Sequence, residues 1–313
     1  QLDNRLVKKL LAEFNSDTEF NTDRIVALRG KDRWLRAIYP AEIDEKSVNT
    51  EWFTKGANVL ITGGLGGIGL SVAKYLSKRG ANNLILLGRS TLPDKNSWDE
   101  ILKSEAQNTR GLRHKIKTLQ EIEALGSTIT TVAADVADLS VMTLLVEDLK
   151  RKLGQIDGVI HAAGVMDDQL AILKSEGSAK SVLTGKAEGA LVLDEVFKAD
   201  ELSFFVLFSS VASYLGLPGQ IDYTAANAFL DAFAHERANR ANGITRVFNW
   251  NAWADVGMTV DVVKELSGEA EKPTLLLAEL TDVSHSALDG FIETTSTDRL
   301  YSTCFSREKH WLL

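Results

Sequence analysis

Five glycines lie within seven residues in the segment VLITGGLGGIGLSVAKYL (59–76), between an apolar run and a helical pattern. Without a Cβ, glycines let backbone N–H groups approach a ligand closely, and a helix N-terminus behind them attracts negative charge. A glycine loop between a strand and a helix is typical of dinucleotide sites; the alternative is a tight turn that merely packs. We expect a pyrophosphate to be held by Thr62, Gly63, Gly64, Leu65, Gly66, Gly67, Ile68 and Gly69.

The residues after the next apolar run, Gly88, Arg89 and Ser90, bear on which dinucleotide binds. Sites for unphosphorylated NAD usually place Asp or Glu there, to bond the ribose 2′-hydroxyl. A guanidinium pairs bidentately with phosphate oxygens, so Arg89 and the Ser90 hydroxyl suit a 2′-phosphate. The alternative is a solvated loop arginine. We expect NADPH rather than NADH.

Short apolar runs alternate with helical patterns from Ala57 onward. Strands that are apolar on both faces and separated by helices indicate a parallel sheet covered on both sides, which is an α/β, doubly wound Rossmann fold. The predicted strands are 58–64, 83–90, 128–136, 156–164, 202–210 and 244–253, and the predicted helices are 70–80, 141–153, 186–199 and 223–241.

Composition excludes several classes of protein. No run of about 18 or more apolar residues is present, so we expect no membrane span. The net charge of −8 disfavours nucleic acid as a partner. Cys304 is the only cysteine, so we expect no disulfide framework, no cysteine-based metal cluster and a cytoplasmic location.

Two stretches fall outside the alternation. Residues 1–55 contain a predicted helix (LVKKLLAEF) and RIVALRGKDRWLRAIYP, which indicates a strand or hairpin. The charged stretch 92–125 is inserted between the second and third strands. It predicts one or two polar helices, with an Asp cap in TLPDKNSWDEIL.

Eight segments, in order and in spacing, resemble the short-chain dehydrogenase/reductase superfamily and, more narrowly, the ketoreductase domain of a modular type I polyketide synthase. They are TGGLGGIG, LLGRS, AADV, VIHAAGV, GKAEGALVLDEV, FVLFSSVAS, GQIDYTAANAFLDAFA and WNAWADVGM, between about Arg24 and Thr259. The resemblance implies reduction, with NADPH, of a β-ketoacyl chain on the phosphopantetheine arm of an acyl carrier protein. It also implies neighbouring polyketide synthase domains as partners.

The resemblance implies four catalytic residues. Tyr223 matches the general acid, and Ser210, thirteen residues earlier, matches the hydroxyl that bonds the substrate carbonyl. Lys186 and Asn227 match the remaining pair, in the exchanged positions that are specific to polyketide ketoreductases. A lysine ammonium about 4 Å from the phenol is worth on the order of 4 kcal/mol at a dielectric of about 20, so we expect it to lower the tyrosine pKa. His161 is expected to be structural.

Further site residues follow from the same resemblance. Asp135, with Val136, resembles the contact to the adenine, although Asp135 equally suits a helix cap. Ala162, Ala163 and Gly164 are interpreted as a close backbone approach to the cofactor.

The position of a stereochemical motif is occupied by Met166, Asp167 and Asp168, where one type of ketoreductase has Leu-Asp-Asp. Leu215 stands where the other type has Trp. Both features predict a B-type enzyme that yields the D-configured (3R) hydroxyl.

Under this resemblance the chain divides into an N-terminal flank (1–55), a remnant of a structural subdomain; a catalytic NADPH-binding domain with its lid (56–281); and a tail (282–313) that leads to a following domain. Carrier-protein docking is expected at Arg237, Arg240 or the 110–117 stretch. The alternatives are a free-standing short-chain reductase of fatty-acyl or steroid ketones, and a catalytically silent scaffold domain.

Overall fold

The computed structural model describes residues 4–14, 26–29, 32–35, 53–104, 106, 109–251, 253 and 257. The predicted lid after Met258 and the predicted tail 282–313 lie outside these residues. No helix in the described part of the chain is long and apolar enough to cross a membrane.

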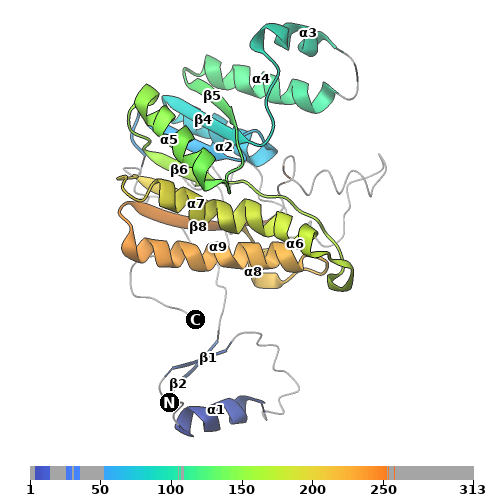
Figure 1. Ribbon diagram of the computed structural model, residues 1–313, viewed down its shortest axis with the longest axis vertical. Helices are drawn as coiled ribbons and strands as arrows, with labels where there is room; N and C mark the ends of the chain where they lie inside the picture. The colour runs from blue at the N-terminus through green and yellow to red at the C-terminus, as the bar shows by residue number, and fades with distance from the viewer. Residues whose placement is uncertain are drawn as a thin grey trace, which may run out of the picture.

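Six parallel strands form the central sheet, in the order β5-β4-β3-β6-β7-β8. Their bounds are β3 Asn58–Thr62, β4 Asn83–Gly88, β5 Thr128–Ala133, β6 Gly158–His161, β7 Phe204–Ser210 and β8 Ile244–Trp250. The strand order runs outward from β3 through β4 to β5, and from β6 through β7 to β8. In such sheets, ligands bind at the carboxyl ends of the strands where the order reverses, here between β3 and β6. The α/β, doubly wound prediction is confirmed (Figure 1).

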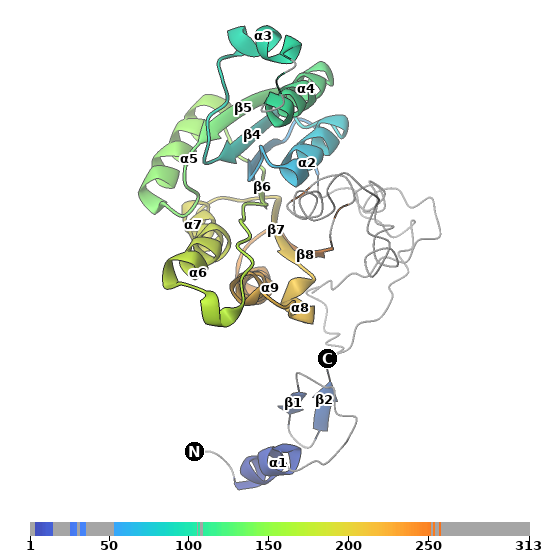
Figure 2. The ribbon, with the colours of Figure 1, turned by 90° about the vertical axis from the view of Figure 1, so that its right-hand side faces the viewer.

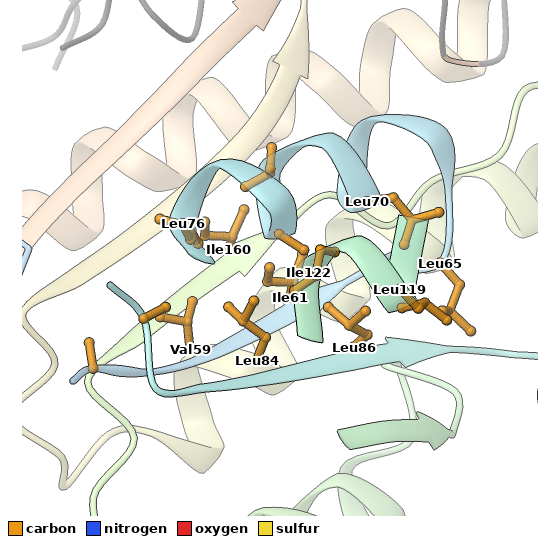
Figure 3. Packing of buried hydrophobic residues seen from close by; sticks show 14 of the residues in the cluster. Val59, Ile61, Leu65, Leu70, Leu76, Leu84, Leu86, Leu119, Ile122 and Ile160 are labelled. Carbon is orange, nitrogen blue, oxygen red and sulfur yellow. The ribbon is translucent and has the colours of Figure 1, made fainter. Parts of the chain in front are cut away.

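Helices cover both faces of the sheet (Figure 2). On one face, α2 (Gly67–Lys78) and α4 (Arg110–Ala124) pack on β3 and β4, and Figure 3 shows Leu76, Leu119 and Ile122 meeting the strand side chains. On the other face lie α5 (Leu139–Leu153), α7 (Gly189–Val196) and α9 (Ile221–Arg240). The inner strands are buried on both faces, whereas the edge strand β5 has half-buried or exposed residues and most residues of the edge strand β8 are half-buried.

The stretch between β4 and β5 forms the short 3₁₀ turn η2 (Lys95–Ser97), α3 (Trp98–Lys103) and α4, as the sequence predicts. Asp94 caps η2 by accepting a hydrogen bond from the backbone N–H of Asn96 at 2.8 Å.

In the N-terminal stretch, the predicted helix is α1 (Asn4–Phe14), and the antiparallel pair β1 (Val26–Arg29) and β2 (Asp32–Leu35) forms the hairpin.

Between β6 and β7 the sequence pattern does not indicate the short 3₁₀ turn η4 (Ala171–Leu173), nor the helix and the π-helical turn that follow it. Helix α6 (Glu176–Leu183) begins where Ser175 accepts a hydrogen bond from the backbone N–H of Ser178 at 3.1 Å. A π-helical turn, η5 (Thr184–Glu188), then joins α6 to α7. Single π turns occur frequently at functional sites. This one contains Lys186. After β7, the short helix α8 (Ala212–Leu215) leads towards α9.

Candidate active site

The glycine loop leaves β3 at Thr62 and enters α2 at Gly67. Gly63 has a φ of +65°, and a Cβ there would lie 2.6 Å from the carbonyl oxygen of Ala162. A Cβ on Gly69 would lie 2.3 Å from the carbonyl oxygen of Gly63. These two glycines therefore let the loop fold tightly against the end of β6 and against its own helix. No side chain caps the first turn of α2, because its N-cap residue is Gly66. The uncapped N–H groups of this turn fit an anionic group.

The residues expected to determine which dinucleotide binds follow β4, the strand that pairs with β3. Strand β4 pairs in parallel with β3 and ends at Gly88, so Arg89 and Ser90 emerge beside the glycine loop. Both side chains are exposed, and no carboxylate stands at these two positions. Asp135 is also exposed, and its Oδ1 accepts a hydrogen bond from the backbone N–H of Ala137 at 3.0 Å, which is a local turn; the helix cap of α5 is Asp138 and not Asp135. Arg89 and Ser90, in place of a carboxylate, fit a phosphorylated dinucleotide.

Other residues of the expected cofactor site have buried side chains. Thr62 is fully buried, and Leu65 and Val136 belong to the two hydrophobic clusters on either face of the sheet. Any contact between these three residues and a cofactor must therefore involve the backbone. Ile68, in the first turn of α2, is partly buried and packs on the hydrophobic cluster between α2 and the sheet. Ala162 and Ala163 donate their backbone N–H groups to Thr62, to its carbonyl oxygen and its Oγ1 respectively, both at 3.2 Å.

His161 links the glycine loop to the turn that carries Lys186. Its Nε2 lies 2.9 Å from the carbonyl oxygen of Lys186, and its Nδ1 lies 2.7 Å from Oγ1 of Thr62. A carbonyl only accepts, so Nε2 carries the proton and Nδ1 accepts from the threonine hydroxyl. Complete burial lowers the pKa of His161 to about 4; the hydrogen bond to the Lys186 carbonyl acts in the opposite direction, and the charge of Lys186 adds a smaller lowering. The imidazole is neutral at physiological pH and fixed at both nitrogens, as expected of a structural histidine.

Lys186 projects from η5 into the core beneath the expected site. Its side chain is buried, and Nζ donates a hydrogen bond to the carbonyl oxygen of Phe208 on β7 at 2.8 Å. A Cβ on Gly164 would lie 2.8 Å from Cε of Lys186, so the glycine after β6 leaves the space that the lysine stem occupies. Burial lowers the pKa of Lys186 to about 8, and the negative charge of Asp231 acts in the opposite direction.

Asp231 was not predicted as part of this site, although a signal existed. It lies four residues after Asn227 and eight after Tyr223, so the three share one face of α9. Asp231 accepts hydrogen bonds from Ser213 at 2.6 Å and from Asn249 at 2.9 and 3.0 Å.

Tyr223 lies in the first turn of α9, and the structure brings the other three predicted catalytic residues around it. Nζ of Lys186 is 5.5 Å from the centre of its ring. Hydrogen bonding from the side chains of Ser210 and Asn227 favours its ionised form. Nδ2 of Asn227 donates to the carbonyl oxygen of Tyr223 at 2.8 Å. Oδ1 of Asn227 is a buried acceptor that has no partner among the described residues.

The expected lowering of the Tyr223 pKa is wrong for this structure, in which the pKa is raised. Desolvation is the largest cause, and the negative charge of Asp168 adds to it. Burial disfavours the charged forms of both the phenol and the ammonium, and Nζ of Lys186 is directed to the Phe208 carbonyl. Tyr223 is therefore protonated at neutral pH, which is the state that a proton donor requires.

The predicted stereochemical motif lies against Tyr223. Met166 is partly buried and packs on a small cluster formed by Val182, Ala212, Tyr223 and Ala226. Oδ2 of Asp168 accepts a hydrogen bond from Nε2 of Gln220 at 2.8 Å, three residues before Tyr223. Leu215, at the end of α8, is exposed.

Arg237 does not fit the expected docking surface. It is buried, donates to Asp194 at 2.9 Å and to Thr245 at 2.8 Å, and stacks on the ring of Phe205. Arg240 also pairs with Asp194, at 2.6 Å. Both arginines tie the end of α9 to α7, so the prediction that Arg237 docks a carrier protein is wrong.

A family model described as the KR domain matches residues 57–255, which is more than half of the chain. This chain belongs to the ketoreductase (KR) domain family of polyketide synthases. Ketoreductase domains are oxidoreductases that bind nicotinamide cofactors, and the resemblance noted in the sequence is confirmed.

Curated relatives of this ketoreductase domain are large synthases. The chain is 42% identical over 202 residues to the 6-methylsalicylic acid synthase of Aspergillus terreus, an alignment that covers 64% of this chain and 11% of that protein. It is 39% identical over 208 residues to a phenolphthiocerol/phthiocerol polyketide synthase of Mycobacterium tuberculosis, covering 66% and 11% of the two chains. The chain thus spans about a tenth of the length of these relatives.

Solved ketoreductases share its fold. A structure described as A-type ketoreductases from a modular polyketide synthase matches with a TM-score of 0.70 and 27% identity, covering 93% of this chain and 55% of that chain. A ketoreductase domain from the bacillaene assembly line matches with a TM-score of 0.67 and 28% identity, covering 92% and 62%.

Proposed function

We propose that this ketoreductase domain uses NADPH to reduce a β-ketoacyl thioester, carried by an acyl carrier protein, to the β-hydroxyacyl thioester. The observation that carries the proposal is the convergence of Tyr223, Ser210, Lys186 and Asn227 at the carboxyl end of the sheet, beside an uncapped glycine-rich helix start. A silent scaffold has no need to retain both features.

Several residues support NADPH as the cofactor. The first turn of α2 would hold the pyrophosphate, and Arg89 and Ser90 would hold the 2′-phosphate. The backbone of residues 162–164 lies next to the glycine loop, and Gly164 contacts the stem of Lys186. When bound there, NADPH would supply the hydride that the ketone carbon accepts.

The proton for the substrate oxygen comes from the hydroxyl of Tyr223. Hydride addition turns the ketone oxygen into an alkoxide, which is a far stronger base than a phenolate, so proton transfer from Tyr223 is favourable even with its raised pKa. The hydroxyl of Ser210 donates a hydrogen bond to the same oxygen and stabilises the charge that develops there.

Lys186 and Asn227 restore the tyrosine after transfer. The ammonium of Lys186, with a pKa of about 8, is mostly protonated at pH 7 and stabilises the phenolate that Tyr223 becomes. The unpartnered Oδ1 of Asn227 accepts a hydrogen bond from a water that returns the proton. Because only the protonated form of Lys186 stabilises the phenolate in this way, turnover is favoured at or below neutral pH.

The motif Met166-Asp167-Asp168 and the absence of Trp at position 215 support B-type stereochemistry, with the 3R hydroxyl as product. The match to A-type structures concerns the fold and not the face of the ketone. Chiral analysis of the product separates the two types.

The test is consumption of NADPH, followed by its absorbance, with a β-ketoacyl thioester and the purified chain. Removing the Tyr223 hydroxyl in Tyr223→Phe should lower kcat by about 100-fold or more. Tyr75→Phe, on α2, is the matched control and should keep the parental rate. Equal rates for the parent and Tyr223→Phe would refute the proposed role of Tyr223, and no reduction by the parent would refute the proposed reaction.

A further inference from the structure

The loop that follows β6 is tied to the start of α9 at three points. The backbone N–H of Gln169 donates to the carbonyl oxygen of Gly219 at 3.0 Å, and Nε2 of Gln220 donates to Asp168 at 2.8 Å. Nζ of Lys174 donates to Oδ2 of Asp222 at 2.6 Å. Asp222 immediately precedes Tyr223, so two segments about fifty residues apart in the sequence meet at the proposed proton donor.

The ion pair between Lys174 and Asp222 is buried, with side chains that are 6% and 3% exposed. A buried pair repays the loss of hydration only when its remaining donors and acceptors are also satisfied. Here Nζ of Lys174 also donates to the carbonyl oxygen of Asp167 and to Oγ of Ser178. The second carboxylate oxygen of Asp222 accepts from the backbone N–H of Tyr223 at 2.9 Å. Each ionic group therefore has several partners.

Met166 packs on the small cluster around Tyr223, but hydrophobic burial does not hold residues 170–173 of this loop in place. Leu170, Ile172 and Leu173 are 61%, 90% and 69% exposed. Polar contacts must fix the segment instead, and those contacts converge on Lys174. The side chain of Asp167 joins the same network by accepting a hydrogen bond from the hydroxyl of Ser178, in the first turn of α6. The network therefore connects three elements: the loop, α6 and α9.

We propose that Lys174 and Asp222 are positioning residues that clamp residues 166–168 against the first turn of α9, and that this clamp fixes the face of the ketone that is presented to Tyr223. This role rests on the proposed ketone reduction. The negative charge of Asp168 acts on Tyr223, so displacement of this loop alters both the wall of the site and the electrostatics at the phenol. Both side chains of the pair are buried, so in this proposal the pair acts through the loop and α9.

The test uses Lys174→Met, Asp222→Asn and the double variant, in which no unpaired buried charge remains. The double variant Lys150→Met/Asp200→Asn is the matched control, because it removes another Lys–Asp pair, between α5 and the segment after α7. For each protein, three quantities are measured: amide hydrogen exchange in residues 166–174, the KM for the thioester, and the ratio of the two product configurations.

We expect exchange in residues 166–174 to become about tenfold faster in all three clamp variants, with core strands unchanged. The KM should rise about tenfold and the minor configuration should increase about tenfold, while the dissociation constant for NADPH stays within about twofold. The double variant should recover much of the thermal stability that the single variants lose, but not the parental product ratio. The control should match the parent in exchange and product ratio.

Parental exchange, KM and product ratio in the double variant would overturn the clamp and leave a purely structural ion pair. Failure of the single variants to fold does not affect this comparison. If the parent reduces no β-ketoacyl thioester, the proposed function fails by itself. The exchange measurement then still decides whether the pair holds the loop, because faster exchange supports the clamp and unchanged exchange refutes it.

Discussion

Substitution of Lys186 by Met removes a buried ammonium and leaves a side chain of similar length. Burial lowers the pKa of Lys186 from 10.5 to about 8, which corresponds to a cost of about 3 kcal/mol to the folded state at pH 7. The variant avoids this cost, but it also loses the hydrogen bond to the Phe208 carbonyl, which reduces its gain in stability by about 1–2 kcal/mol. We expect Lys186→Met to be more stable than the parent by about 1–2 kcal/mol at pH 7 and to have lost most of its turnover.

The pH dependence of this difference follows from the direction of the pKa change. Below pH 8 the folded and unfolded chains both carry a protonated lysine, so the folded parent bears the full cost. Between about pH 8 and 10.5 the folded chain has released the proton and the unfolded chain still holds it, so the stability of the parent rises with pH. The advantage of the Met variant should therefore narrow as the pH rises above 8.

Urea denaturation at pH 7 and at pH 9.5, followed by tryptophan fluorescence, measures both quantities. Lys150→Met is the control, because Lys150 is partly exposed and should show no such gain. A Lys186→Met variant that is less stable than the parent at pH 7, or a difference that does not narrow at pH 9.5, would refute the assignment of a costly buried ammonium.

Three further predictions concern the cofactor loop and the pH profile. Gly69→Ala places a Cβ 2.3 Å from the Gly63 carbonyl oxygen, so it should lower the free energy of unfolding, measured by urea denaturation, by about 2–4 kcal/mol and abolish NADPH binding. The control is Gly111→Ala in α4, where open space surrounds the position, and it should raise the free energy of unfolding by about 0.5–1 kcal/mol. Parental stability of Gly69→Ala would contradict the close packing of the loop. Arg89→Ala should raise the KM for NADPH by about tenfold or more and leave the KM for NADH within about twofold, in initial-rate assays; an equal effect on both cofactors would exclude a 2′-phosphate contact. The kcat of the parent should fall as the pH rises through about 8, because Lys186 loses its proton, and a flat profile from pH 7 to pH 9.5 would contradict its role as an ammonium.

The sequence predicts the sheet well because each strand is a local, apolar run that is bounded by glycine or polar residues. The glycine loop is equally local, and its geometry follows from Gly63 and Gly69, where a Cβ has no room. The spacing of Tyr223 and Asn227 places both on one face of α9, so their contact also follows from the sequence.

Contacts between distant segments could not be predicted in this way. Nothing in the local pattern pairs Lys174 with Asp222, because either charge is equally suited to an exposed position. Arg237 was expected on the surface for the same reason, and its burial depends on Asp194 and Phe205 from other elements. The direction of the Tyr223 pKa also depends on desolvation, which only the packed structure reveals.

The most direct test of the proposed reaction follows the transferred hydrogen itself. NADPH that carries deuterium at the reactive C4 position is incubated with the chain and a β-ketoacyl thioester, and the product is analysed by mass spectrometry and chiral chromatography. We predict one deuterium on the β-carbon of a 3R hydroxyacyl product, and about 100-fold less of that product per unit time when Tyr223→Phe replaces the parent. A product without deuterium at that carbon, or no reduction at all by the parent, would contradict the proposed hydride transfer.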